Sequence, residues 1–375
     1  NRLRQALRAL FLPLYTLSIK SAKVYILHKM EEPVMKRLSK LTALLLALAL
    51  TLSLAACSGG GGGQAATPAP NTATPDPSGS APGGSYVVGI CQLAPHPALD
   101  AATQGFKDAL TEALGDAVTF REGNAGGEAP GCTTIIDGFI AEGVDLILAN
   151  ATASLTAAAS ATDTIPILGT AITNYGVALN LDSTEDKVLG GNISGTSDLA
   201  PLDQQAAMLQ ELFPDAKNVG LVYCSAEPNS VFQVEAVQGY LEGMNYTCTQ
   251  YAFTDVNDLA SVVQTACDNS DVLYIPTDNT AANNTETIAN IVIPAQMPVI
   301  AGESGICSGC GLATLSISYE EIGRIAGEMA VQILTGEKSV SELAIGFDTT
   351  LDKMYNADMA QALNITMPEG YQPIG

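Results

Sequence analysis

Short apolar runs alternate with longer amphipathic stretches from about residue 86 to the end of the chain. In the first half such runs occur at 86–91, 118–121, 144–149 and 165–170, with a strand or crossover at 192–195. Between them, stretches such as 98–114 repeat apolar residues at helical spacing. Strands that are apolar on both faces are typical of a parallel sheet covered by helices. The pattern therefore predicts an α/β lobe.

A second set of alternating elements begins with a helix at 201–213. Apolar runs that predict strands follow at 218–224, 246–253, 271–276, 298–301, 312–317 and near 344–347. Helices are predicted at 230–243, 258–267, 279–293, 319–335 and near 356–363. Two successive sets of this kind predict two α/β lobes.

The N-terminal part has a different pattern. The basic segment 35–40 precedes an apolar run at 41–54, and the sequence Leu54-Ala55-Ala56-Cys57 stands at the end of this run. This order resembles the bacterial lipobox, which implies a lipoprotein signal peptide at 35–56 and a lipid attached to Cys57. The alternative is a membrane-spanning helix, but the run is shorter than the roughly 20 residues that a span requires.

The segments on either side of this signal carry separate expectations. Residues 1–34 are interpreted as an over-extended N-terminus, with an unusually long basic region as the alternative. Residues 57–85 begin with the lipidated cysteine and are mostly Gly, Ala, Thr, Pro and Ser. Such a segment buries too little apolar surface to fold, so we expect a flexible linker.

The charge and the histidine count exclude several function classes. The 375 residues contain 16 Lys and Arg against 39 Asp and Glu, a net charge of −23, which disfavours binding to nucleic acid. Beyond the signal peptide the only histidine is His96. A metal site with several imidazoles is therefore excluded, and any catalytic triad would have to use His96. We expect no catalytic residue, metal or cofactor.

Eight cysteines are present, seven of them after Cys57. Seven is an odd number, so at least one has no partner within the chain. Cys307 and Cys310 are separated by two residues, a spacing that suits a disulfide, a redox dithiol or a structural role. No second such pair completes a zinc site, and the structural role is favoured.

Polar residues follow the predicted strands, where ligands bind in open α/β sheets. Ser, Thr and Asn at helix starts offer backbone N–H groups to a carboxylate, whereas acidic residues accept from an ammonium or hydroxyl group. Together they predict a site for a zwitterion, although each one alone is explained as a helix cap or turn former. The candidates are His96, Pro97, Asp100, Thr152, Ala153, Thr170, Ser197, Asp198, Ser225, Asn229, Ser230, Thr277, Asp278, Asn279 and Glu303.

Several strings in this order resemble one known family. They include Pro95-His96-Pro97-Ala98-Leu99-Asp100, Gly195-Thr196-Ser197-Asp198 and Pro276-Thr277-Asp278-Asn279. From about residue 86 to the C-terminus the chain resembles the type I solute-binding lipoproteins of tryptophan/tyrosine-type ABC importers. The loop that contains Cys307 and Cys310 departs from that family.

The resemblance implies the α/β type I periplasmic-binding-protein fold, with two Rossmann-like lobes, a hinge and an interlobe ligand cleft. Residues 86–198 plus about 318–340 would form lobe 1, and 199–317 plus about 341–375 would form lobe 2. Three segments would cross between the lobes. An ABC permease and ATPase are the implied partners.

The expected function is that of an extracytoplasmic solute-binding lipoprotein, a monomer held on the bacterial cell membrane by its lipid anchor. It would capture a small amino-acid-like ligand, with an aromatic amino acid as one candidate, and deliver it to the permease. The alternatives are a type I binding protein for a sugar or nucleoside-like solute, or a ligand sensor ectodomain. We expect no enzyme, because no nucleophile motif is evident.

Overall fold

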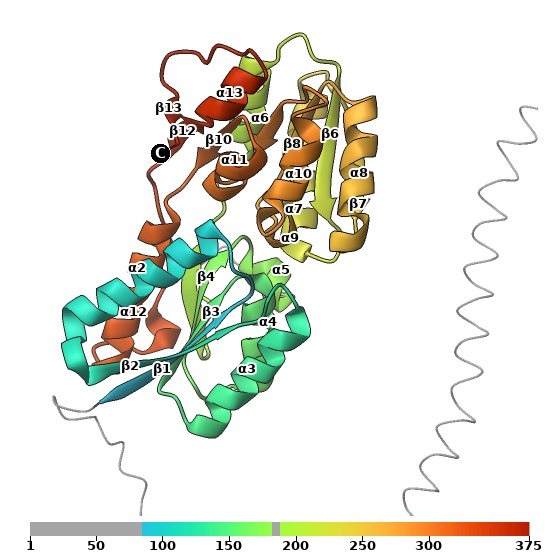
Figure 1. Ribbon diagram of the computed structural model, residues 1–375. Coiled ribbons are helices and arrows are strands. Elements are labelled where there is room, and N and C mark those ends of the chain that lie inside the picture. Colours follow the sequence, from blue (N-terminus) through green and yellow to red (C-terminus); the bar gives the residue numbers. More distant parts are fainter. Residues whose placement is uncertain (1–84, 182–187, 375) are drawn as a thin grey trace, which may run out of the picture. The chain divides into compact units, whose positions relative to one another are not determined.

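The computed structural model describes residues 85–181 and 188–374 (Figure 1). The expected N-terminal extension at 1–34, the signal peptide at 35–56 and the linker, including Cys57 and all but its last residue, lie outside the described residues. None of the helices within the described ranges is long and apolar enough to cross a membrane.

The first sheet has six strands in the order β11-β5-β4-β3-β1-β2. Every pairing in it is parallel. The core order β2-β1-β3-β4-β5 is the doubly wound order whose switch point lies between β1 and β3. The strands are β1 (Tyr86–Gln92), β2 (Val118–Asn124), β3 (Leu146–Asn150), β4 (Ile167–Ile172), β5 (Ile193–Ser197) and β11 (Gly346–Phe347).

Helices cover both faces of this sheet because its strands are apolar on both sides. On β3, Leu146 and Leu148 pack in one core cluster with side chains of α2 and α12, whereas Ile147 and Ala149 pack in another with α3 and α4. The helices are α2 (Pro97–Leu114), α3 (Ala129–Glu142), α4 (Thr152–Ala161), α5 (Tyr175–Leu179) and α12 (Tyr319–Leu334), with short 3₁₀ turns at Gly115–Ala117 and Val340–Glu342.

The second sheet has seven strands in the order β13-β12-β10-β9-β8-β6-β7. It repeats the strand order of the first sheet, and only the β10–β12 pairing is antiparallel. The strands are β6 (Asn218–Cys224), β7 (Thr247–Phe253), β8 (Val272–Ile275), β9 (Val299–Ala301), β10 (Ala313–Ser316), β12 (Asp352–Tyr355) and β13 (Gln372–Pro373).

Two apolar clusters also sandwich the second sheet. Side chains of α6 and α7 form one with Val219 and Leu221, and those of α8, α10 and α11 form the other with Val222. The predicted α/β fold with two Rossmann-like lobes is therefore confirmed. The helices are α6 (Leu202–Leu212), α7 (Pro228–Gly243), α8 (Val256–Asn269), α9 (Asn279–Ala282), α10 (Thr285–Val292), α11 (Ser304–Cys310) and α13 (Ala357–Ala362).

The C-terminal part of the chain is divided between the sheets. Helix α12 packs against α2 beside the first sheet (Figure 1). Strand β11 then pairs with β5 and forms the edge of that sheet. The first sheet therefore keeps the chain as far as Phe347, beyond the boundary near residue 340 that was expected from the sequence. A strand near 344–347 was predicted from the sequence, but a local pattern does not show which sheet a two-residue strand joins.

Three segments connect the two sheets: β5 to α6, β10 to α12, and β11 to β12. Hydrogen bonds join these crossings to one another. The hydroxyl of Tyr319 donates to Oδ2 of Asp198 at 2.9 Å, which links the second crossing to the first. The backbone N–H of Ser318 donates to Oδ2 of Asp348 at 2.9 Å, which links the second crossing to the third.

Candidate ligand-binding site

His96 lies where β1 passes into α2. It occupies the position before the helix, and Pro97 begins the helix with its fixed backbone angle. The imidazole is 6% exposed, and its Nε2 lies 3.3 Å from Oδ1 of Asn279. Since an amide oxygen only accepts, Nε2 carries the proton and donates. Burial lowers the pKa of His96, and its Nδ1 has no partner among the described residues.

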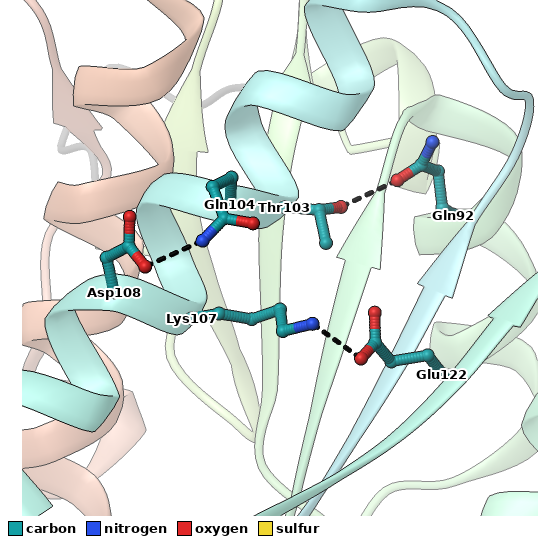
Figure 2. A network of polar contacts seen from close by, with 6 residues as sticks. All are labelled: Gln92, Thr103, Gln104, Lys107, Asp108 and Glu122. Atoms are coloured by element: carbon teal, nitrogen blue, oxygen red, sulfur yellow. Dashed lines mark hydrogen bonds and ion pairs between the residues drawn. The ribbon is translucent and has the colours of Figure 1, made fainter. Parts of the chain in front are cut away.

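Polar contacts between β1, β2 and α2 fix the position of this helix (Figure 2). Oε1 of Gln92, at the end of β1, accepts from the Thr103 hydroxyl at 2.7 Å, and the two side chains face each other in Figure 2. Nε2 of Gln92 donates to Oδ1 of Asp100 at 2.6 Å. Lys107 further along α2 pairs with Glu122 of β2 at 2.6 Å. The start of α2, and with it His96, is therefore held against the strand ends.

Asp198 follows β5 and is 4% exposed. Its Oδ2 accepts from the Tyr319 hydroxyl, whereas Oδ1 is buried with no partner within the described residues. Burial raises the pKa of the Asp198 carboxyl, and the hydroxyl groups of Tyr319 and Thr173 offset part of that rise. Asp198 is thus a buried acid with one oxygen free to accept a further hydrogen bond.

The other two buried acids serve as helix caps. Asp278 accepts from the backbone N–H groups of Cys224 at 2.7 Å and Ala281 at 2.8 Å. Glu303 accepts from the N–H groups of Gly305 and Ile306 at the start of α11. Burial raises the pKa of each carboxyl to about 7. Their oxygens are already engaged, so the alternative interpretation as caps describes both of them correctly.

Glu227 was not among the candidates. Its carboxylate accepts hydrogen bonds from side-chain amides of residues that follow β6 and β8. One of its oxygens accepts from Nδ2 of Asn279 at 2.6 Å and from Nδ2 of Asn229 at 3.1 Å. Asn229 also donates to the carbonyl of Thr277 at 3.2 Å. These bonds hold the loops after β6 and β8 together.

Residues that follow strands of both sheets line a cavity of only about 10 Å³, which has room for about one water molecule. This is far below the ~300 Å³ at which small-molecule pockets usually begin. Three carboxylates and no Lys or Arg occur among the described residues that line it. The lining consists of His96, Leu99, Ala171, Thr173, Asp198, Asn229, Thr277, Asp278, Asn279, Ala282, Glu303 and Tyr319.

Seven of the fifteen candidates therefore line one cavity, and the structure places the other eight around it. Thr152 and Ala153 line a wider neighbouring groove. Pro97 and Ser225 are exposed, and Oδ1 of Asp100 accepts a hydrogen bond from Nε2 of Gln92. Thr170 accepts from Thr196, Ser197 donates to the carbonyl of Thr173, and Ser230 is buried beside Asn229.

Five lining residues were not among the candidates. Tyr319 comes shortly after the end of β10, as Asp198 comes after β5, and this position could have identified it as a candidate. An aromatic ring there is equally explained as the first apolar position of α12. Ala171 has a left-handed backbone with φ of 54°, a conformation that is uncommon for alanine and is found at functional sites. Leu99 and Ala282 have the spacing of ordinary core residues, and no local signal marks them.

Comparisons with known proteins agree on one family. The family model described as ABC transporter substrate binding protein matches residues 87–371. A tyrosine-binding protein of Clostridioides difficile (strain R20291) is 35% identical over 284 residues, which cover 74% of this chain and 81% of that protein.

Two solved structures are similar as well. The ABC domain from Streptococcus pneumonia in complex with L-Trp has 31% identity and a TM-score of 0.72, covering 76% of this chain and all of that one. The ligand-free, open structure of a substrate-binding protein with adhesive properties from Clostridium difficile has 34% identity and a TM-score of 0.60, covering 77% and 99%.

Proposed function

Because the chain belongs to the ABC transporter substrate-binding protein family, we propose that it captures an aromatic amino acid in the cavity around Asp198 and delivers it to an ABC permease. It acts by reversible binding and without a chemical step. Tyrosine and tryptophan are the first ligands to test, because similar proteins are described as binding tyrosine and as holding L-Trp.

The free Oδ1 of Asp198 is the observation that carries this proposal. A buried carboxylate oxygen without a partner is costly, and an ammonium group that donates to it removes that cost. Among the described residues no Lys or Arg lines the cavity, so a cation that pairs with this acid would come from the ligand. This arrangement favours an amine over a neutral sugar.

Because the cavity is too small for an amino acid in this conformation, the proposal requires the two lobes to move apart when the ligand enters. The other residues that line the cavity suit an aromatic side chain. Leu99, Ala171 and Ala282 supply apolar surface, and Tyr319 and His96 supply rings. Nδ1 of His96 is a buried acceptor without a partner among the described residues, and the phenol of tyrosine or the indole N–H of tryptophan would donate to it. One side of the cavity would thus accept a hydrogen bond from the ligand's ammonium group, and another side would accept one from a donor on the ligand's ring.

Isothermal titration with ligands that differ by one group tests the proposal. L-tyrosine, L-tryptophan and L-phenylalanine are compared with 3-(4-hydroxyphenyl)propionate, which has no ammonium group, and with glucose. We expect the amino acids to bind and the propionate to bind far more weakly. Binding of glucose with none by the amino acids would reject the proposal.

We further propose that residues 35–56 direct export, that Cys57 carries the lipid anchor, and that the protein works as a monomer with a permease and an ATPase. Support comes from the lipobox and from the family's role in ABC transport. Labelling cells with an alkyne-tagged palmitate tests this. We expect label on the wild type and none on Cys57→Ala. Equal labelling of both would overturn the assignment of the lipid anchor to Cys57.

A further inference from the structure

Two cysteines that the ligand cavity does not use lie side by side in the first lobe. Cys91 is the last residue but one of β1, and Cys132 lies in the first turns of α3. Both are completely buried. They are 41 positions apart in the sequence and meet only through the fold.

Ser154 of α4 lies against both sulfur atoms. Its Oγ is 3.6 Å from Sγ of Cys91 and 3.3 Å from Sγ of Cys132. Sγ of Cys91 also donates to the backbone carbonyl oxygen of Cys132 at 3.9 Å. Cys91 lowers the pKa of the Cys132 thiol to about 7, whereas Cys132 and burial raise the pKa of Cys91. Cys132 is therefore the more acidic thiol of the pair.

The remaining described cysteines do not combine a neighbouring thiol with a lowered pKa. Cys310 donates to the carbonyl of Ile306, and both burial and Glu303 raise the pKa of Cys307 and Cys310. Burial likewise raises the pKa of Cys267 to about 11. These thiols are protonated at neutral pH, and a protonated thiol is a poor nucleophile.

We propose that Cys91 and Cys132 form a redox-responsive dithiol that closes to a disulfide on meeting a small disulfide of the extracytoplasmic medium. The proposal does not depend on the identity of the ligand. It assigns chemistry to a pair that the cysteine spacing in the sequence does not reveal.

The reaction is two thiol–disulfide exchanges. The Cys132 thiolate attacks a small disulfide RSSR, forms a mixed disulfide and releases RS⁻. Cys91 then loses its proton and attacks the Cys132 sulfur, which forms the Cys91–Cys132 bond and releases a second RS⁻. The two cysteines are oxidised and one RSSR is reduced to two thiols.

The surroundings of Cys132 give a route for the reagent. Its neighbours Pro130 and Thr133 line the wide groove, and two glycines with positive φ, Gly126 and Gly127, precede α3. Local opening of the first turn of α3 would expose Cys132 to the reagent. Once formed, the disulfide ties α3 to the end of β1, just before the loop that carries His96.

The test treats the full mature protein with oxidised glutathione, unfolds it, blocks free thiols with N-ethylmaleimide and maps the peptides by mass spectrometry. We expect a linked peptide with Cys91 and Cys132 that is lighter by two hydrogen atoms than the reduced pair. In Cys91→Ser, Cys132 should carry glutathione instead. Cys267→Ser is the matched control and should keep the linked peptide.

A second readout does not depend on any variant. A disulfide that closes a loop of this length should raise the melting temperature of the oxidised wild type by at least ~4 °C over the dithiothreitol-treated protein. Recovery of Cys91 and Cys132 as free, alkylated thiols after oxidation would overturn the proposal, as would a link from either one to another cysteine.

Discussion

The hydroxyl of Tyr319 donates a 2.9 Å hydrogen bond to Oδ2 of Asp198, and the two residues stand on different crossings between the sheets. Asp198 follows β5 on the way to α6, and Tyr319 begins α12 after β10. The other oxygen of the same carboxylate is buried without a partner among the described residues, and Asp198 lines the cavity. A ligand that binds Asp198 therefore acts on a group that also joins two connecting segments.

Asp198→Asn should weaken amino acid binding by ~30-fold or more, because it removes the negative charge that faces the ligand's ammonium group. Isothermal titration with L-tyrosine and L-tryptophan measures the effect. Asp203→Asn is the matched control, since Asp203 is exposed on α6. Equal affinity of the wild type and the Asp198 variant would show that the ammonium group binds elsewhere.

Amino acid binding should weaken as the pH falls from 8 to 5. Burial raises the pKa of Asp198, so this carboxyl takes up a proton at a higher pH than an ordinary aspartate and can then no longer pair with an ammonium group. Titrations across this range measure the trend. Asp198→Asn should flatten it, and a wild-type affinity that rises toward acid pH contradicts the assignment.

Tyr319→Phe should lower the free energy of unfolding by ~1–3 kcal/mol, because a buried carboxylate oxygen loses its donor. Urea denaturation monitored by circular dichroism measures this change. Tyr240→Phe is the control, since that ring is 46% exposed. If the two variants lose the same small amount, the Tyr319 bond does not stabilise the protein.

Glu303 should make the protein less stable as the pH rises from 4.5 to about 7. Its pKa is about 7 in the folded protein against an ordinary 4.5, so within this window the folded state keeps a proton that the unfolded chain has released. The loss amounts to at most about 3 kcal/mol. Urea denaturation of Glu303→Gln at several pH values should give a shallower slope.

Glu286→Gln is the control for that measurement, because Glu286 is exposed on α10. It should keep the slope of the wild type. Asp278, whose pKa is also raised to about 7, should leave some slope in the Glu303 variant. A Glu303 variant with an unchanged slope would show that this carboxyl does not titrate in the window.

Gly105→Ala should destabilise the protein by more than ~2 kcal/mol, because α2 and α12 touch at this point. A Cβ at Gly105 would lie 2.1 Å from the carbonyl oxygen of Glu320, and one at Gly323 would lie 2.0 Å from that of Ala102. Gly138→Ala on the exposed side of α3 meets nothing and should stabilise by ~0.5–1 kcal/mol. Thermal unfolding of the variants compares them, and a harmless Gly105→Ala would contradict this close packing.

Much of the site could be predicted because it follows from the strand pattern. Asp198 and Glu303 stand within two residues of the ends of β5 and β9, and Asn229 lies in the first turn of the helix that follows β6. Parallel strands place their carboxyl ends at one edge of the sheet. Asp100 and Ser225 follow strands as well, but Asp100 is engaged by Gln92 and the Ser225 hydroxyl donates to the carbonyl of Phe253. Sequence position identifies the edge and does not identify the direction of a side chain.

The two α/β lobes could be predicted from the sequence, because strand and helix patterns are local and strands that are apolar on both faces need helices on both sides. Only the folded chain shows that Tyr319 contacts Asp198, that Cys91 lies beside Cys132, and that β11 joins the first sheet. Each of these depends on contacts between residues more than 40 positions apart. No local periodicity records such contacts, because they arise only when separate elements pack.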